Sequence, residues 1–182
     1  MTSIDNALQR WRIKKAAQHI APGARVLDIG SGDGALFKVL GDRLGSGLGV
    51  DPTLKADCDL GRIRLRAGYF PEAVPASGEL FDAITMLAVL EHFPDDVYAK
   101  LSENCAKFLK PQGRVVITVP SAMVDRILAV LKFCRLIDGM SIEEHHGYDT
   151  ERTEAVFTPH FRLVLHQRFQ LGLNNLFVFE KI

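Results

Sequence analysis

The sequence predicts one α/β domain built around a doubly wound, mostly parallel sheet. Between residues 25 and 119, short apolar runs alternate with longer helical patterns, which is typical of successive β-α-β units. The chain has 182 residues, 47% of them hydrophobic and 24% charged, so we expect a single domain spanning 1–182 with one full core. A glycine-rich turn follows the first apolar run, where folds of this class bind ligands.

Most of the predicted parallel strands are followed by Gly, Asp or Pro, where the chain can turn. The strands are expected at 25–29, 47–50, 63–67, 81–87 and 113–119, with helices through 36–44 and 95–109. The stretch 51–63 is too short for a crossover helix, so one irregular turn over 52–58 is expected there. A closing hairpin of 161–170 and 175–181 gives about seven strands, the last antiparallel.

Two further helices are expected outside these units. The first precedes the sheet, with Ile4, Leu8, Trp11 and Ile20 facing the core. The second covers 123–137, which is too short and too charged to span a bilayer. That apolar helix has three candidate roles, which are to pack in the core, to cover a hydrophobic ligand, or to form a homodimer contact.

Composition argues against several classes of protein. Lys and Arg together number 22 and so do Asp and Glu, and the pI is near 7.0, so no overall field favours nucleic acid as a partner. Three cysteines in no CxxC arrangement indicate neither a disulfide framework nor a zinc site. Residues 1–20 mix charges with apolar residues and do not resemble a signal segment, so a cytoplasmic location is expected.

The strongest local signal is the turn at residues 30–34, which reads GSGDG. Glycine removes the side chain that would hold a ligand away from the backbone, and the helix that follows offers unpaired N–H groups. Asp51 ends the second strand, twenty-one residues after Gly30, where a carboxylate can accept hydrogen bonds from ribose hydroxyls. Together they predict a nucleoside-bearing cofactor held at Gly30, Ser31, Gly32, Gly34 and Asp51.

The glycines alone leave two cofactor classes open. Gly30, Gly32 and Ala35 also satisfy the dinucleotide pattern G-x-G-x-x-A, which nicotinamide-dependent oxidoreductases share. Asp28 stands two residues before the first glycine and would be unfavourable beside a pyrophosphate. The same carboxylate suits a cationic ligand.

Four motifs in order make the sequence resemble the class I S-adenosylmethionine-dependent methyltransferases, in the branch with the type 11 methyltransferase domain. They are VLDIGSGDG, GVDPT, FDAITMLAVLEHFPD and LKPQGRVVITVP, within residues 24–119. The resemblance implies a Rossmann-like methyltransferase fold and S-adenosyl-L-methionine as cofactor. It also implies that Asp28 and the glycine loop hold the amino-acid end of the cofactor, and that Asp51, with Pro52 beside it, holds the ribose.

One family position differs in this chain. Many relatives have an acid after the glycine that ends the third strand, where it binds the adenine amino group, whereas this sequence reads Ala67-Gly68-Tyr69-Phe70. Backbone groups and aromatic packing at Tyr69 and Phe70 are one way to bind adenine instead. The alternative is that both side chains only cover the edge of the sheet.

The resemblance places the cofactor methyl group just past the fourth strand, so Leu87 and Ala88 are expected to line the substrate mouth. His92 is a candidate proton acceptor there, and its alternative is a histidine that packs beneath the cofactor. His145 and His146 lie in a second polar cluster, EEHHGYD, and are candidate catalytic residues or part of a solvated loop. No spacing among them indicates a metal site.

The sequence therefore predicts methyl transfer from S-adenosyl-L-methionine to an acceptor, with a small molecule expected. A non-catalytic protein that keeps the cofactor-binding fold is the alternative, suggested by the short second crossover and the missing adenine acid. A nicotinamide-dependent oxidoreductase is a weaker one, because it leaves Asp28 and the fourth-strand motif unexplained.

Overall fold

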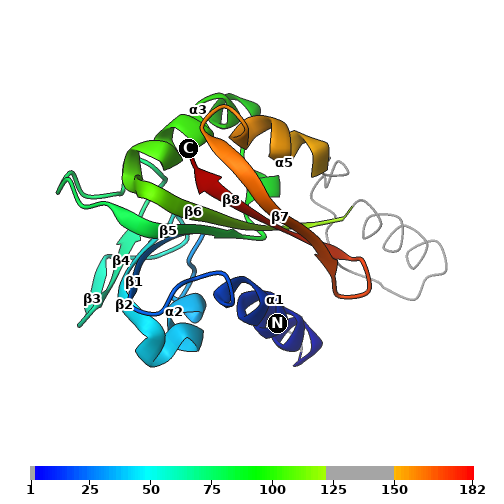
Figure 1. The fold of residues 1–182 in the computed structure, drawn as a ribbon. Helices are drawn as coiled ribbons and strands as arrows, with labels where there is room; N and C mark the ends of the chain where they lie inside the picture. The colour runs from blue at the N-terminus through cyan, green and yellow to red at the C-terminus, as the bar shows by residue number, and fades with distance from the viewer. Residues whose placement is uncertain (1–2, 122–149) are drawn as a thin grey trace.

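The computed structural model describes residues 3–121 and 150–182 (Figure 1). Its helices are α1 (Ser3–Ala17), α2 (Ala35–Leu40), α3 (Asp95–Phe108) and α5 (Thr150–Phe157), with short 3-10 turns η1 (Gly41–Arg43) and η2 (Leu90–His92). Its strands are β1 (Ala24–Ile29), β2 (Leu44–Asp51), β3 (Cys58–Leu60), β4 (Ile63–Ala67), β5 (Phe81–Leu87), β6 (Leu109–Pro120), β7 (Phe161–Phe169) and β8 (Asn174–Lys181). The predicted helix 123–137 lies outside the described residues.

The strands form one twisted sheet in the order β3-β4-β2-β1-β5-β6-β8-β7. Strands β4, β2, β1, β5 and β6 are parallel, whereas β8 pairs antiparallel with β6 and β7 antiparallel with β8. This confirms the predicted doubly wound α/β fold with its closing hairpin. Strand order reverses between β1 and β5, and ligands bind at such switch points, outside the carboxyl ends of the strands.

The sheet has eight strands in the described residues, one more than the sequence suggested. The extra strand is β3, which pairs antiparallel with β4 from Cys58 opposite Leu65 to Leu60 opposite Ile63. The prediction of a single irregular turn over 52–58 therefore missed a small edge hairpin. Three residues are too few to produce a periodic apolar pattern, so the strand left no signal in the sequence.

Helices cover both faces of the sheet. In Figure 1, α1 and α2 lie on one face, and α3 and α5 lie on the other. Successive residues of β1 face opposite sides of the sheet. Val26 packs on the side of α1 and α2, whereas Leu27 and Ile29 pack on the side of α3 and α5. Asp28 lies on the same face of β1 as Val26, so its buried side chain is on the α1 and α2 side of the sheet.

The predicted core face of α1 is wrong in part. Leu8 and Trp11 are 38% and 49% exposed, whereas Ile13, Ala16 and Ala17 are buried. Both sets have helical spacing, but the two alanines allow α1 to approach the sheet closely, so the larger Trp11 faces outward. Ile20, just after the helix, is buried as expected. The change of face brings Gln9 and Arg12 toward the sheet, where they line a small hollow.

The closing hairpin is tied to α1. The Gln170 side-chain amide donates a hydrogen bond of 2.8 Å to the backbone carbonyl of Leu8, so the tip of the hairpin holds the helix in place. In the described part of the chain, no helix is both long and apolar enough to cross a membrane.

Candidate active site

The site lies where the carboxyl ends of β1, β2 and β5 meet. The register places Ile29 beside Val50 of β2 and Met86 of β5, so the loops that follow these strands share one edge of the sheet. The N–H of Gly30 donates a hydrogen bond of 2.9 Å to the carbonyl of Val50, which joins the glycine turn to the second strand. Residues far apart in the sequence therefore converge around the GSGDG turn.

All three glycines of the turn have left-handed backbone angles, with φ of +76° at Gly30, +50° at Gly32 and +76° at Gly34. They have different surroundings. A Cβ on Gly30 would lie 2.6 Å from Val89 Cγ2, whereas a Cβ on Gly32 would meet nothing within 4 Å. Gly30 is therefore required for packing against Val89, and Gly32 leaves open space where a ligand can reach the backbone.

Asp51 is held by the turn that it faces. Its Oδ2 accepts a hydrogen bond of 2.7 Å from the N–H of Gly32, and its Oδ1 accepts bonds from the N–H and the hydroxyl of Thr53, at 2.8 and 2.6 Å. Burial acts to raise the pKa of Asp51, but the bonds from Thr53 and Gly32 outweigh it and hold the pKa below its usual value. Asp51 is therefore an ionised acceptor at neutral pH.

Asp28 is the second carboxyl of the site and behaves differently. It is 4% exposed, and its Oδ1 accepts a hydrogen bond of 2.6 Å from the Thr85 hydroxyl on β5. Burial raises the pKa of Asp28 to about 7, the Thr85 bond opposes this rise, and the nearby charge of Asp51 adds to it. A buried carboxyl poised at neutral pH is stabilised in its ionised form by a cationic ligand.

A small hollow beside Asp28 contains a residue that the sequence reasoning missed. Arg12 of α1 lines it with Asp28, Ser31 and Leu87, and the Arg12 Nε and Ser31 Oγ atoms are buried without a hydrogen-bond partner among the described residues. Burial lowers the pKa of Arg12, which the Glu91 charge opposes. The sequence feature that could have indicated this role is the position of Arg12, directly before Ile13, which lies with Ala16 and Ala17 on the buried face of α1.

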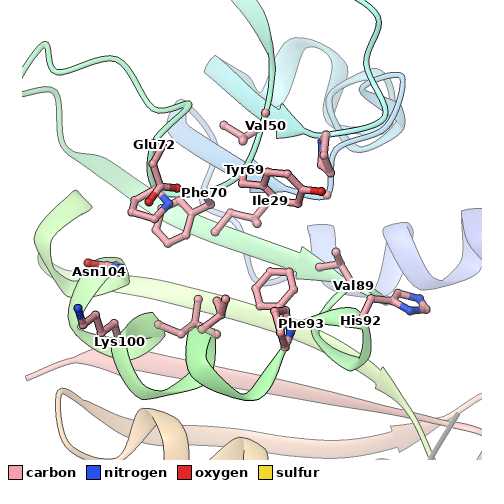
Figure 2. A pocket seen from close by; sticks show the side chains of 17 residues that line it. Ile29, Val50, Tyr69, Phe70, Glu72, Val89, His92, Phe93, Lys100 and Asn104 are labelled. Atoms are coloured by element: carbon pink, nitrogen blue, oxygen red, sulfur yellow. The ribbon is translucent and has the colours of Figure 1, made fainter. Parts of the chain in front are cut away.

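A larger cavity of about 590 Å³ opens on the α3 side of the same turn (Figure 2). Ile29, Gly30, Val50 and Pro52 line it from the sheet. Tyr69 and Phe70 line it from the loop after β4, Tyr69 being 73% exposed and Phe70 half-buried, with its ring packed edge-on to Phe108 of α3. The cavity therefore lies beside the predicted ribose acceptor.

The predicted residues at the end of β5 and in the segment that follows it lie on both sides of the turn. Leu87 lines the hollow of Arg12 and Asp28, whereas Val89 and His92 line the large cavity. Ala88, between them, has φ of +56°, an unfavourable angle for a residue with a side chain. Its N–H donates a hydrogen bond of 2.9 Å to the carbonyl of Thr118, which holds this bend.

The remaining predicted histidines, His145 and His146, lie outside the described residues, so their catalytic role stays a prediction. Among the described residues, no group of three or more His, Cys, Asp and Glu side chains is arranged to hold a metal ion.

The arrangement fits a ligand that is an amino acid at one end and a nucleoside at the other. A cation and a carboxyl with unfilled hydrogen-bonding capacity face the smaller hollow, and buried polar atoms of this kind call for a partner. A charged acceptor, Asp51, lies in the chain between Val50 and Pro52, which line the apolar cavity, and binds the N–H of Gly32, next to Ser31 of the hollow. Gly32 leaves open space above the turn. S-adenosylmethionine has these parts in this order.

Comparison with known proteins agrees with this fit. The family model Methyltransf_23, described as "Methyltransferase domain", matches residues 4–156. The match covers most of the chain, so the protein belongs to the methyltransferase domain family, which confirms the predicted class of S-adenosylmethionine-dependent methyltransferase. The nicotinamide oxidoreductase alternative is thereby set aside.

Two curated relatives have different acceptors in their names. The chain is 32% identical to ubiquinone biosynthesis O-methyltransferase of Pectobacterium carotovorum over 118 residues, covering 60% of this chain and 48% of that protein. It is 34% identical to tRNA U34 carboxymethyltransferase of Methylococcus capsulatus over 119 residues, covering 59% and 36%. The chain thus matches half or less of the length of these relatives.

Solved structures share the fold at low sequence identity. The N-methyltransferase NodS from Bradyrhizobium japonicum, in complex with S-adenosyl-L-homocysteine, superposes with a TM-score of 0.67 at 17% identity. The match covers 99% of this chain and 88% of that one, so the whole described architecture is shared.

Proposed function

We propose that this protein transfers a methyl group from S-adenosylmethionine to a small-molecule acceptor. The observation that carries the proposal is the convergence of Arg12, Asp28, Gly32 and Asp51 on one edge of the sheet. When bound, the cofactor supplies a methyl group on a positively charged sulfur. The protein then has to hold its two ends, align an acceptor behind the methyl carbon and exclude water.

The two charged groups at the amino-acid end of the cofactor call for partners of opposite charge. Arg12 is the candidate partner of the cofactor carboxylate, and Asp28 of its ammonium group, since both line the smaller hollow. Asp51 has about four acceptor positions, of which Thr53 and Gly32 fill three. One ribose hydroxyl therefore binds without rearrangement, and the second binds when the Thr53 hydroxyl turns away.

A small molecule is favoured over tRNA by the distribution of charge. Several basic side chains on the described surface are paired with acids, among them Arg64 with Glu79 at 2.6 Å and Lys110 with Asp82 at 2.6 Å. Phosphate binding needs unpaired basic groups gathered on one face, and the formal net charge of the chain is zero. The ubiquinone pathway relative, whose name specifies an O-methyltransferase, supports the same class of acceptor.

A hydroxyl acceptor would require a base. His145 and His92 are the first and second candidates, followed by His146, and of these His92 lines the cavity beside the turn. Replacing the responsible histidine with Gln should lower turnover by about 10²- to 10⁴-fold and leave cofactor affinity within a few-fold. An amine acceptor would need no such base.

The test has two stages. Calorimetric titration with S-adenosylhomocysteine, with NADH as the control ligand, should show binding of the former alone. Radiolabelled S-adenosylmethionine is then incubated with a low-molecular-mass extract and, separately, with total tRNA. Label in the extract is expected. Label in tRNA alone would overturn the small-molecule assignment, and cofactor binding with no transfer to either fraction would favour the non-catalytic alternative.

A further inference from the structure

The 590 Å³ cavity has apolar walls, a cluster of polar side chains at one end, called here the polar end, and a histidine at the other. The walls are formed by Ile29, Val50, Phe70, Phe93, Val97 and Leu101. Figure 2 shows Glu72, Lys100 and Asn104 gathered at one end of the cavity and His92 at the other. A flat, apolar ligand with hydrogen-bonding groups along one edge matches this distribution.

Two elements set the shape of the polar end. Lys100 and Asn104 are one helical turn apart on the face of α3 that also carries Val97 and Leu101, so helix geometry directs these side chains to the cavity. The loop after β4 brings Phe70 and Glu72 to the opposite side. The edge-on contact of Phe70 with Phe108, with ring centroids 5.6 Å apart, holds this loop against α3.

The polar groups at this end retain their hydrogen-bonding capacity. Within the described residues, neither the Asn104 amide nor the Glu72 carboxylate makes a side-chain hydrogen bond or ion pair. Asn104 is half-buried, so its amide is partly withdrawn from solvent. An amide that carries both a donor and an acceptor can form two bonds with the edge of adenine, where an amino group stands next to a ring nitrogen.

We propose that Asn104, assisted by Glu72, binds the polar edge of the cofactor adenine. These side chains replace the acid that many family members have at the position of Tyr69. The proposal rests on the proposed function, since it assigns the adenine end of the same cofactor. In it, the Asn104 carbonyl and the Glu72 carboxylate accept hydrogen bonds from the adenine amino group, and the Asn104 NH₂ donates to the adjacent ring nitrogen.

The experiment compares two ligands by calorimetry, S-adenosylhomocysteine and S-inosylhomocysteine, in which a carbonyl replaces the adenine amino group. Wild-type protein should prefer the amino ligand by about tenfold or more. Asn104→Leu should lose about 10- to 100-fold in affinity for S-adenosylhomocysteine and most of this preference. Glu72→Gln should lose less, and Lys107→Ala, on the exposed face of α3, is the matched control and should bind as wild type does.

A second variant tests the location of the adenine. Tyr69→Asp in the Asn104→Leu background restores an acid at the family position and should recover the preference for the amino ligand. No recovery would place adenine away from this loop and overturn the proposal. Unchanged affinity and preference in both Asn104→Leu and Glu72→Gln would overturn it while leaving the proposed function intact. A wild-type protein that binds neither ligand would overturn both.

Discussion

Asp28 and Asp51 are two carboxyls of one site whose pKa values move in opposite directions. Asp28 is buried with one hydrogen bond, from Thr85, and its pKa rises to about 7, whereas Asp51 accepts three bonds and its pKa falls. Asp51 is therefore ionised at neutral pH and available to the ribose, whereas Asp28 is only partly ionised there and a neighbouring cation favours its charged form.

The raised pKa of Asp28 predicts pH-dependent binding. Below pH 7 the carboxyl is mostly protonated in the free protein, and an ammonium ligand favours the ionised form, so binding releases a proton. Affinity for S-adenosylhomocysteine should therefore weaken about tenfold from pH 8 to pH 6. Asp28→Asn should bind more weakly throughout, with a flat profile. Calorimetry in buffers of different ionisation enthalpy measures the proton release, and an equal slope in the variant would contradict the assignment.

Asp51 is expected to contribute through ribose contacts. Asp51→Ala should weaken binding of S-adenosylhomocysteine by about 1.5–3 kcal/mol, because a charged acceptor is lost. Asp51→Asn should lose less, since its carbonyl still accepts one bond. Because Asp51 also holds the Gly32 N–H, the unfolding free energy of each variant is measured alongside. Normal affinity in a folded Asp51→Ala protein is the result that would refute the ribose role.

At the scale of elements, the turn from β1 and the bend after β5 are one packed unit. Gly30→Ala should destabilise the fold by about 2–4 kcal/mol, because its Cβ would lie 2.6 Å from Val89 Cγ2 and its φ is +76°. Adding Val89→Ala should recover only the part of the clash due to the Val89 Cγ atoms, because the Val89 Cβ that alanine keeps would still lie 2.9 Å from the added Cβ. Chemical denaturation of both variants gives these values, and a double variant no more stable than Gly30→Ala would exclude Val89 as the cause.

Gly32 lies in the same turn as Gly30, but its substitution is expected to affect ligand binding more than folding. Gly32→Val should fold with a loss of about 1–2 kcal/mol from its φ of +50°, since no atom lies within 4 Å of the added Cβ. It should nevertheless abolish binding of S-adenosylhomocysteine, because the branched side chain fills the space above the turn. Circular dichroism separates folding from binding here. A folded variant with wild-type affinity would show that the cofactor does not approach Gly32.

Ala88 stores strain at the bend that leads from β5 into the site. Its φ of +56° predicts that Ala88→Gly will stabilise the protein by about 1 kcal/mol. The midpoint of urea denaturation measures this change. A loss of stability would mean that the methyl group of Ala88 packs usefully despite the angle.

For the whole molecule, the sequence was informative where the signal is local. Apolar alternation predicted the parallel strands, and the GSGDG turn, Asp28 and Asp51 lie within the motifs that define the fold. Strand β3 was missed because three residues carry no period. The outward face of α1 was misassigned because Trp11 outweighs Ala16 in hydrophobicity, although only the smaller side chain allows close packing against the sheet.

The contributors to the site that sequence reasoning missed are brought there only by folding. Arg12 reaches the hollow from a helix that precedes the sheet, and Asn104 reaches the cavity from the middle of α3, so neither stands near a motif. Val89 lies within a recognised motif, but its packing against Gly30 depends on the bend at Ala88. These contacts arise from the tertiary structure, so no residue spacing in the sequence predicts them.

A crystal structure with bound S-adenosylhomocysteine tests the central claim most directly. We expect the ribose at Asp51, the amino-acid end between Arg12 and Asp28, and the adenine in the cavity that Val50 and Pro52 line. Ligand density elsewhere on the molecule, or a ligand whose ribose lies away from Asp51, would contradict the assignment of this edge of the sheet as the cofactor site.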